Sequence, residues 1–156
     1  MSIQEMFRSQ YLAGSALKAG RGWMNTIMNN LANSNTVDTG KVGKDGNYVP
    51  YKRQVPVFSK VLSEKFRENK VNEDILNGVK VEDIADIPGE VKIWDPSHPA
   101  ARRAGTKDAG YVYFPKVVVA QEMADMRMAS AYYEANLSAY SVSNKMMQGA
   151  LSLGKS

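Results

Sequence analysis

Both ends of the sequence carry apolar and small residues at the spacing of a long helix, and no other feature constrains the fold as much. The pattern runs from Ile3 to about Asn33 and again from Val119 towards the C-terminus, without proline in either stretch. Alternating steps of three and four residues are the spacing of a coiled-coil seam. At about 1.5 Å per residue, the two helices would be roughly 45 and 50 Å long. We therefore expect a mainly α fold with a small β-rich insert, whose long N- and C-terminal helices pair as a coiled-coil stalk.

The seam on each helix is weak, because several of its positions are small or polar. On the N-terminal helix the seam comprises Ala13, Leu17, Gly20, Met24, Ile27 and Leu31. On the C-terminal helix one line comprises Val119, Met126, Tyr133, Tyr140 and Met147, and the other comprises Met123, Ser130, Leu137, Asn144 and Leu151. A glycine inside a helix costs about 1 kcal/mol relative to alanine, and polar seam residues lower stability while they fix register.

Apolar residues also lie outside the seams, among them Phe7, Trp23 and Tyr132. Two helices of one chain cannot cover all of this surface, and large exposed apolar patches usually mark contacts with partners. We therefore interpret the seams as surfaces that pack against neighbouring molecules. A simple intramolecular core is the alternative interpretation.

The middle of the chain has a different composition. Residues 79–81 and 91–94 alternate as half-buried strands do, and Pro88-Gly89 between them is a turn signal. Residues 48–58 and 111–114 also have strand-like content, and the charged stretch 59–77 suits a short helix or a mobile loop. The expected organisation is an N-terminal helix over 1–36, a β-rich insert over 37–116 and a C-terminal helix over 117–156.

Composition excludes several classes of protein. The chain has no cysteine, so disulfides, thiolate catalysis and zinc–thiolate sites are ruled out. Its net charge of +4 is spread along the chain, unlike the concentrated basic surface of a nucleic-acid binder. No apolar stretch approaches the roughly 18 residues of a membrane span, and the first ten residues lack the basic start and apolar run of a signal peptide. We expect neither a membrane-integral protein nor a cleaved signal peptide.

No catalytic, cofactor-binding or metal-binding residues are predicted, and no cofactor is expected. His98 is the only histidine and lies between two prolines, which suits a turn. Asp83, Asp86 and Glu90 have no base or nucleophile grouped with them and suit a solvated face. The glycines and lysines of residues 40–44 lack the spacing of a phosphate-binding loop.

Several segments, in order along the chain, resemble the flagellar rod, hook and hook-associated axial family, and within it the rod protein C subfamily. The wider family is matched by Asn30–Thr36, by Tyr51–Arg53 with Val57-Phe58, by Glu122-Met123, by Ser130–Asn136 and by Leu151–Gly154. The subfamily is matched by Asp95–Ala100 and by Gly110–Val112 with Pro115. Lys116 and the long charged segment 64–77 depart from the subfamily's pattern.

The resemblance implies a structural subunit of the proximal part of the bacterial flagellar basal-body rod, not an enzyme. Such a subunit polymerises through its terminal helices, transmits torque and encloses the export channel. The resemblance also implies export from the cytoplasm by the flagellar type III apparatus and residence in the periplasm-spanning rod. The alternatives are another rod or hook-associated axial protein, or an enzyme that acts on peptidoglycan.

The partners implied by the resemblance are proteins, with no nucleic acid among them. They are other rod subunits, the MS-ring and export-gate base, hook-basal-body adaptor proteins and a flagellar export chaperone or gate. Together they would form a hetero-oligomeric helical assembly.

The asparagines near the end of the first helix are candidate structural residues. We expect Asn30 and Asn33 to bond backbone groups where the helix leaves the stalk and so to fix the angle of the insert, although plain helix capping is the alternative. The predicted assembly interface comprises Ala13, Leu17, Gly20, Met24, Ile27, Leu31, Asn30, Asn33, Thr36, Met123, Met126, Tyr133, Asn136, Leu137, Tyr140, Met147 and Leu151.

Overall fold

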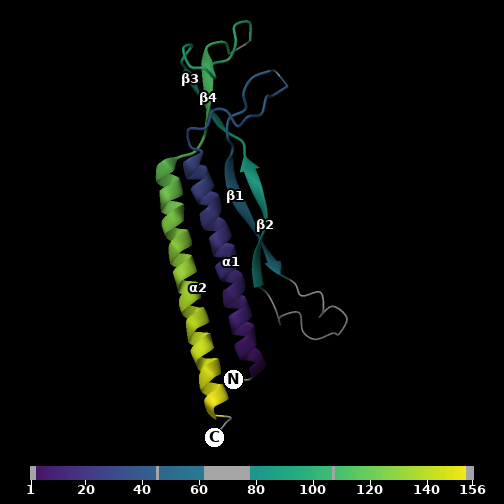
Figure 1. The fold of residues 1–156 in the computed structure, drawn as a ribbon, viewed down its shortest axis with the longest axis vertical. Coiled ribbons are helices and arrows are strands. Elements are labelled where there is room, and N and C mark those ends of the chain that lie inside the picture. The colour runs from purple at the N-terminus through teal and green to yellow at the C-terminus, as the bar shows by residue number, and fades with distance from the viewer. Residues whose placement is uncertain (1–2, 45, 62–77, 107, 154–156) are drawn as a thin grey trace. The chain divides into compact units, whose positions relative to one another are not determined.

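The computed structural model describes residues 3–44, 46–61, 78–106 and 108–153 (Figure 1). Helix α1 spans Ile3–Ala32 and helix α2 spans Val119–Leu153. Between them lie strands β1 (Arg53–Val61), β2 (Gly78–Ile87), β3 (Glu90–Trp94) and β4 (Tyr111–Pro115). This confirms the expected pair of long terminal helices and the strand-containing insert. For the charged stretch 59–77 we expected a short helix or a loop, but residues 59–61 are the end of β1, and residues 62–77 lie outside the described residues.

The strands form two small sheets. β1 pairs with β2, and β3 pairs with β4 in an antiparallel register that sets Lys92 opposite Tyr113 and Trp94 opposite Tyr111. The two strands of the second sheet differ in burial, because Val112 and Tyr113 of β4 are buried while every residue of β3 is exposed. β3 is therefore an exposed strand that pairs with a buried one.

The chain divides into two compact units, and each contains parts of both helices. Unit 1 comprises residues 1–24, 56–83 and 126–156, and unit 2 comprises residues 25–55 and 84–125. Each unit is thus built from separate segments of the polypeptide, three in unit 1 and two in unit 2. Both units therefore depend on contacts between segments that are far apart in the sequence.

In unit 1, small residues form the contact between α1 and α2. Ala13, Ala16 and Ala19 of α1 are buried, as is Ala129 of α2. Gly20 approaches α2 so closely that a Cβ atom there would lie 3.2 Å from the Tyr132 ring. Small side chains allow helix backbones to approach each other closely, and here they leave little room for larger residues.

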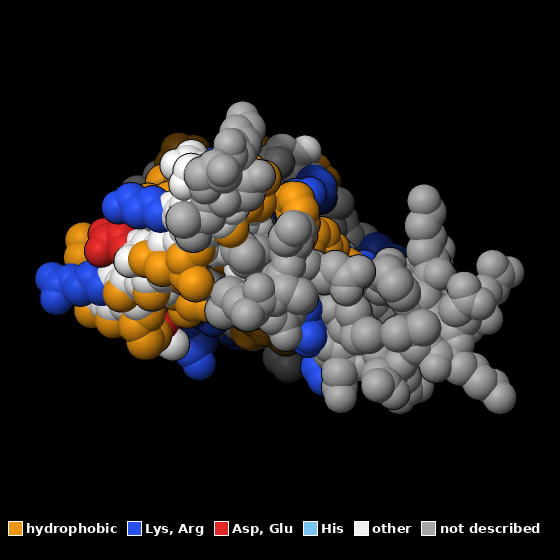
Figure 2. Space-filling view, turned by 90° about the horizontal axis from the view of Figure 1, so that it is seen from below, with side chains coloured by type: hydrophobic (Ala, Val, Ile, Leu, Met, Phe, Trp, Pro, Cys, Tyr) orange, Lys and Arg blue, Asp and Glu red, His pale blue; other side chains and the backbone are white. Residues whose placement is uncertain are grey.

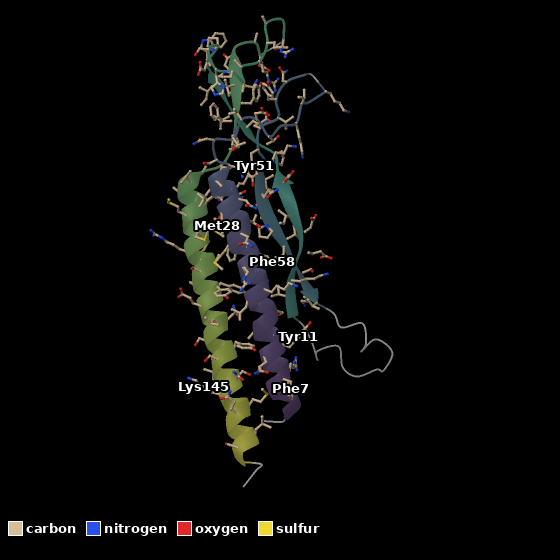
Figure 3. The ribbon with its side chains drawn as sticks, viewed as in Figure 1. Phe7, Tyr11, Met28, Tyr51, Phe58 and Lys145 are labelled. Carbon is tan, nitrogen blue, oxygen red and sulfur yellow. The ribbon has the colours of Figure 1, made fainter. Side chains whose placement is uncertain are left out.

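Another face of α1 contacts strands β1 and β2 of unit 1. The ring of Trp23 meets the ring of Phe58 edge-on, with 6.1 Å between their centroids. The backbone N–H of Val79 donates to Ser15 Oγ at 3.2 Å. Figure 3 labels Tyr11 and Phe58 on this side of the helix. Within unit 1, α1 is therefore packed between α2 and the strands (Figure 1).

Exposed residues interrupt both lines of the expected seam on α2, namely Tyr140 on the first line and Leu137 and Leu151 on the second. On the first line, Met126, Tyr133 and Met147 are half-buried, as predicted. On the second line, Ser130 and Asn144 are half-buried, and the positions one residue earlier, Ala129, Asn136, Ser143 and Ala150, are covered as well. Close approach to the small residues of α1 explains why Ala129 lies in the contact, while large apolar side chains such as Leu137 and Leu151 remain exposed.

Candidate functional site

A buried polar junction in unit 2 is the most distinctive site of the described chain. At its centre is Asn30, in the last turn of α1, with only 1% of its surface exposed. Asn30 Nδ2 donates to the backbone oxygen of Gln54 at 2.8 Å and to Glu122 Oε2 at 2.9 Å. Asn30 Oδ1 accepts from Gln54 N at 2.8 Å and from the Tyr51 hydroxyl at 2.9 Å. The amide therefore uses its full bonding capacity.

The second member of the junction is Glu122, which lies in the first turn of α2 and is completely buried. Arg53 Nε donates to Glu122 Oε1 at 2.6 Å, and Arg53 Nη2 donates to Asp125 Oδ2 at 3.3 Å. Burying a carboxylate is costly unless a counter-charge and hydrogen bonds compensate it. Arg53 and Asn30 supply both, so β1, α1 and α2 are joined by one connected set of bonds.

Tyr51 completes the junction with a hydroxyl group that donates to Asn30. Burial raises the pKa of the Tyr51 hydroxyl above 10.0, and the nearby carboxylates of Asp86 and Glu122 raise it further. The physical cause is that a phenolate would be poorly solvated there and repelled by both charges. Tyr51 thus remains a hydrogen-bond donor throughout the neutral pH range. Figure 3 labels Tyr51.

The polar residues after Asn30 make local bonds. Asn33 Nδ2 donates to the backbone oxygen of Asn29 at 2.9 Å, and Thr36 Oγ1 donates to Asn33 Oδ1 at 3.1 Å. Thr36 contributes one longer-range bond, because its backbone oxygen accepts from Tyr51 N at 3.0 Å. Of the two predicted asparagines, Asn30 bonds the backbone of a distant strand, whereas Asn33 caps its own helix.

The predicted interface residues are distributed between covered and exposed positions. The buried ones are Ala13, Gly20, Ile27 and Asn30, and the half-buried ones are Leu17, Met24, Leu31, Asn33, Thr36, Met126, Tyr133, Asn136 and Met147. The exposed ones are Met123, Leu137, Tyr140 and Leu151. The structure therefore brings most of the predicted set into contacts within the chain and leaves four large side chains at the surface.

Sequence reasoning gave no role to four members of the junction: Tyr51, Arg53, Gln54 and Glu122. Arg53 lies in a recognised family segment, but nothing in the sequence says which carboxylate it meets. Glu122 also lies in a segment that resembles the family, but a carboxylate within a helix is ordinarily solvated, so the segment did not indicate its burial. Polar contacts between the helices were also missed, with Ser9 Oγ 2.6 Å from Ser143 Oγ and Gln10 Nε2 donating to Asn144 Oδ1 at 3.3 Å.

Large apolar side chains remain exposed on the helices of unit 1. They comprise Phe7 and Tyr11 of α1 and Met128, Tyr132, Leu137, Tyr140, Val142, Met146 and Leu151 of α2. Figure 2 shows hydrophobic side chains at the described surface, interspersed with Lys and Arg.

The described residues contain no cluster of three or more His, Cys, Asp or Glu suited to a metal ion. His98 is occupied structurally, because its Nδ1 accepts from Ala100 N at 3.0 Å and its ring lies edge-on to Phe114. Neither described helix has the length and apolar character needed to cross a membrane.

Comparisons with known proteins agree with this architecture. The family model described as flagellar basal body rod FlgEFG protein C-terminal matches residues 108–153. The flagellar basal-body rod protein FlgC of Borreliella burgdorferi is 34% identical over 154 residues, which covers 95% of this chain and 97% of that protein. FlgC of Aquifex aeolicus is 33% identical over 94% of this chain and 95% of its own. FlgC of Bacillus subtilis is 32% identical over 96% and 98%.

Proposed function

Since the chain belongs to the family of the flagellar basal-body rod protein FlgC, and is a structural subunit of that rod, we propose that it polymerises through its two terminal helices. Membership in a family of structural proteins confirms that the chain is not an enzyme. The subunit assembles with other components of the flagellar basal body.

One observation carries the polymerisation proposal. The contact between α1 and α2 in unit 1 uses small residues such as Ala16 and Ala129, while Met128, Leu137 and Leu151 remain exposed on α2. A helix that needed only its intramolecular partner would turn its largest apolar side chains towards that partner. The exposed residues therefore support contacts with neighbouring subunits. A contact between two different surfaces repeats without closing and so generates a helical assembly.

The finer organisation follows from the same premise. We assign residues 1–36 and 117–156 to the stalk and residues 37–116 to the insert, with the two helices pairing as a coiled coil. The polar pairs Ser9–Ser143 and Gln10–Asn144 support this pairing, because they favour one register of the helices over its neighbours. The polar junction then holds the start of β1 against both helices, which would keep the insert at one angle in every copy.

The position in the rod and the partners are part of the proposal. The subunit would lie in the proximal rod, span the periplasm, transmit torque and enclose the export channel. It would leave the cytoplasm through the flagellar type III apparatus without a cleaved signal, helped by an export chaperone or gate. Its neighbours would be other rod subunits, the MS-ring and export-gate base, and hook-basal-body adaptor proteins.

Removing the exposed apolar residues of α2 tests the polymerisation surface. Leu137→Ser with Leu151→Ser should leave the helix content of the purified subunit unchanged, because both side chains are exposed. The same variant should fail to support motility or rod formation as the only copy in cells. Ser138→Ala with Gln148→Ala, at exposed polar positions of the same helix, is the matched control and should assemble normally. Full motility of the leucine variant would refute the proposal.

A further inference from the structure

Strand β3 has one edge that no described strand covers. β3 pairs with β4 along one edge, and these two strands make up their whole sheet among the described residues. Val91, Ile93 and Trp94 of β3 are 45%, 47% and 61% exposed. An uncovered edge presents backbone N–H and C=O groups that can pair with another strand.

Proteins ordinarily protect such an edge with a proline, a bulge or an outward-pointing lysine. No proline lies inside β3. Its lysine is turned back onto its own sheet, where Lys92 Nζ donates to Asp108 Oδ1 at 2.9 Å and lies 5.1 Å from the centroid of the Tyr113 ring. The inward-turned lysine leaves the backbone groups along this edge open to strand addition.

The charges of β3 indicate which strand fits this edge. Its first three residues, Glu90, Val91 and Lys92, are complementary to the same three residues read in the opposite direction. With Val91 opposite Val91 of a second copy, each glutamate lies opposite a lysine, a favourable cross-strand pair. With Lys92 opposite Lys92 instead, like charges would face each other, which is unfavourable.

We propose that two copies of the chain pair through β3, antiparallel and centred on Val91, to form a four-stranded sheet with the order β4–β3–β3–β4. This contact uses the same surface on both copies, so it closes as a dimer. It is a contact of the subunit outside the polymer, and it does not rest on the helix surfaces that drive polymerisation. A five-residue strand buries far less than the roughly 1,200–2,000 Å² of a stable interface, so the dimer forms at high protein concentration.

A single cysteine tests the contact directly. The chain has no cysteine, so Val91→Cys introduces the only thiol. Residues directly opposite each other in antiparallel strands have the spacing that a disulfide needs, and mild oxidation should yield a covalent dimer. Ile93→Cys is the matched control, because in this register the two new thiols lie four residues apart along the strand, about 13 Å. It should cross-link at least about 10-fold more slowly, since thiols that far apart cannot bond without strand movement.

The charge pattern supplies a second test. In the Val91→Cys background, Glu90→Lys sets lysine opposite lysine at two places and should slow cross-linking about 5-fold or more. Glu134→Lys makes the same charge change at an exposed position of α2 and should leave the rate unchanged. Circular dichroism of each variant establishes that it is folded.

Three results would overturn the proposal. Equal cross-linking of the Val91→Cys and Ile93→Cys variants would mean random collision. Efficient cross-linking of a Lys92→Cys variant but not of Val91→Cys would mean another register. A disulfide in cells between the Val91→Cys variant and a cysteine-bearing basal-body protein, without self-linking, would assign the edge to a foreign strand.

Discussion

At the scale of single residues, the side-chain amide of Asn30 links the end of α1 to β1 and α2. It bonds both backbone groups of Gln54, as a neighbouring strand would, and it also contacts Tyr51 and Glu122. Because the site is buried, each lost bond exposes a polar group to apolar surroundings. The junction is therefore sensitive to the length and shape of one side chain.

Replacing Asn30 with alanine should lower the free energy of unfolding by about 3 kcal/mol. The change leaves several buried polar groups without their partner, and each such group costs about 1–3 kcal/mol. Asn33→Ala is the control, since its amide makes an exposed bond within its own helix, and it should cost about 1 kcal/mol or less. Urea unfolding of both variants measures the difference. Equal losses would contradict the role given to Asn30.

Tyr51 should contribute a dependence of stability on alkaline pH. Its pKa is raised in the folded protein, so the folded state holds this proton when the unfolded chain loses it above pH 10. The contribution of Tyr51 is therefore complete below pH 10 and is lost as pH rises through the folded pKa. The measurement is the free energy of unfolding from pH 8 to 12, for the parent and for Tyr51→Phe. The parent should decline more steeply above pH 10, and parallel curves would refute the assignment.

At the scale of helices and strands, close packing of small residues determines how α1 and α2 meet. Ala13, Ala16 and Gly20 of α1 allow the approach, and Ala129 of α2 completes it. Such a contact buries little apolar area for its length, so each additional methyl group has a large effect on the free energy of unfolding.

Two glycines of α1 should respond oppositely to alanine. Gly14→Ala adds a Cβ that meets nothing within 4 Å, and it should raise the free energy of unfolding by about 0.5–1 kcal/mol through helix propensity. Gly20→Ala places its Cβ 3.2 Å from Cδ1 of Tyr132, so the ring must move. The rise in the free energy of unfolding that helix propensity would give should therefore be lost or reversed. Thermal unfolding of both variants compares them, and equal stabilisation would show that the helices do not meet closely at Gly20.

Much of the element structure could be predicted from the sequence. The helices follow from long proline-free stretches with helical periodicity, and residues 91–94 and 111–114 lie within β3 and β4. The second contact line of α2 could not be predicted, because it depends on the small residues of the partner helix. Leu137 is a better seam residue than Asn136 by composition, yet Asn136 is the more covered of the two.

The junction was only partly predictable for a related reason. Asn30 could be identified from its place at a helix end within a family segment. Arg53 and Glu122 are 69 residues apart in the sequence, and no local pattern connects them. Their pairing becomes visible only when β1 and α2 are placed together in space.

At the scale of the whole molecule, the two units differ in the contacts that stabilise each of them internally. Unit 1 contains the small-residue helix contact, whereas unit 2 contains the buried junction and the second sheet. In that sheet, the Arg102 guanidinium lies 3.8 Å from the centroid of the Tyr113 ring, and the Tyr113 hydroxyl donates to Asp108 Oδ2 at 2.7 Å. Local stability follows buried contacts, so unit 2 should be the more stable unit in the free subunit.

Hydrogen exchange of the free subunit tests this difference. Amides of α1 before residue 24 and of α2 after residue 126 should exchange at least about 10-fold faster than those around Asn30, Gln54 and Val112. Limited proteolysis should likewise cut the terminal helices before the centre. On assembly, the helix amides should become protected. Uniform protection of both helices in the free subunit would mean that they need no neighbours.

The two tryptophans of the chain are divided between the units. Trp23 of unit 1 lies against Phe58 and Tyr132, while Trp94 of unit 2 is at the surface on the strand proposed for pairing. Each unit therefore carries its own intrinsic fluorophore, of which Trp23 is half-buried and Trp94 is exposed to water. With Trp94→Phe, the remaining tryptophan emission reports on the helices of unit 1 alone, and with Trp23→Phe, it reports on β3 alone.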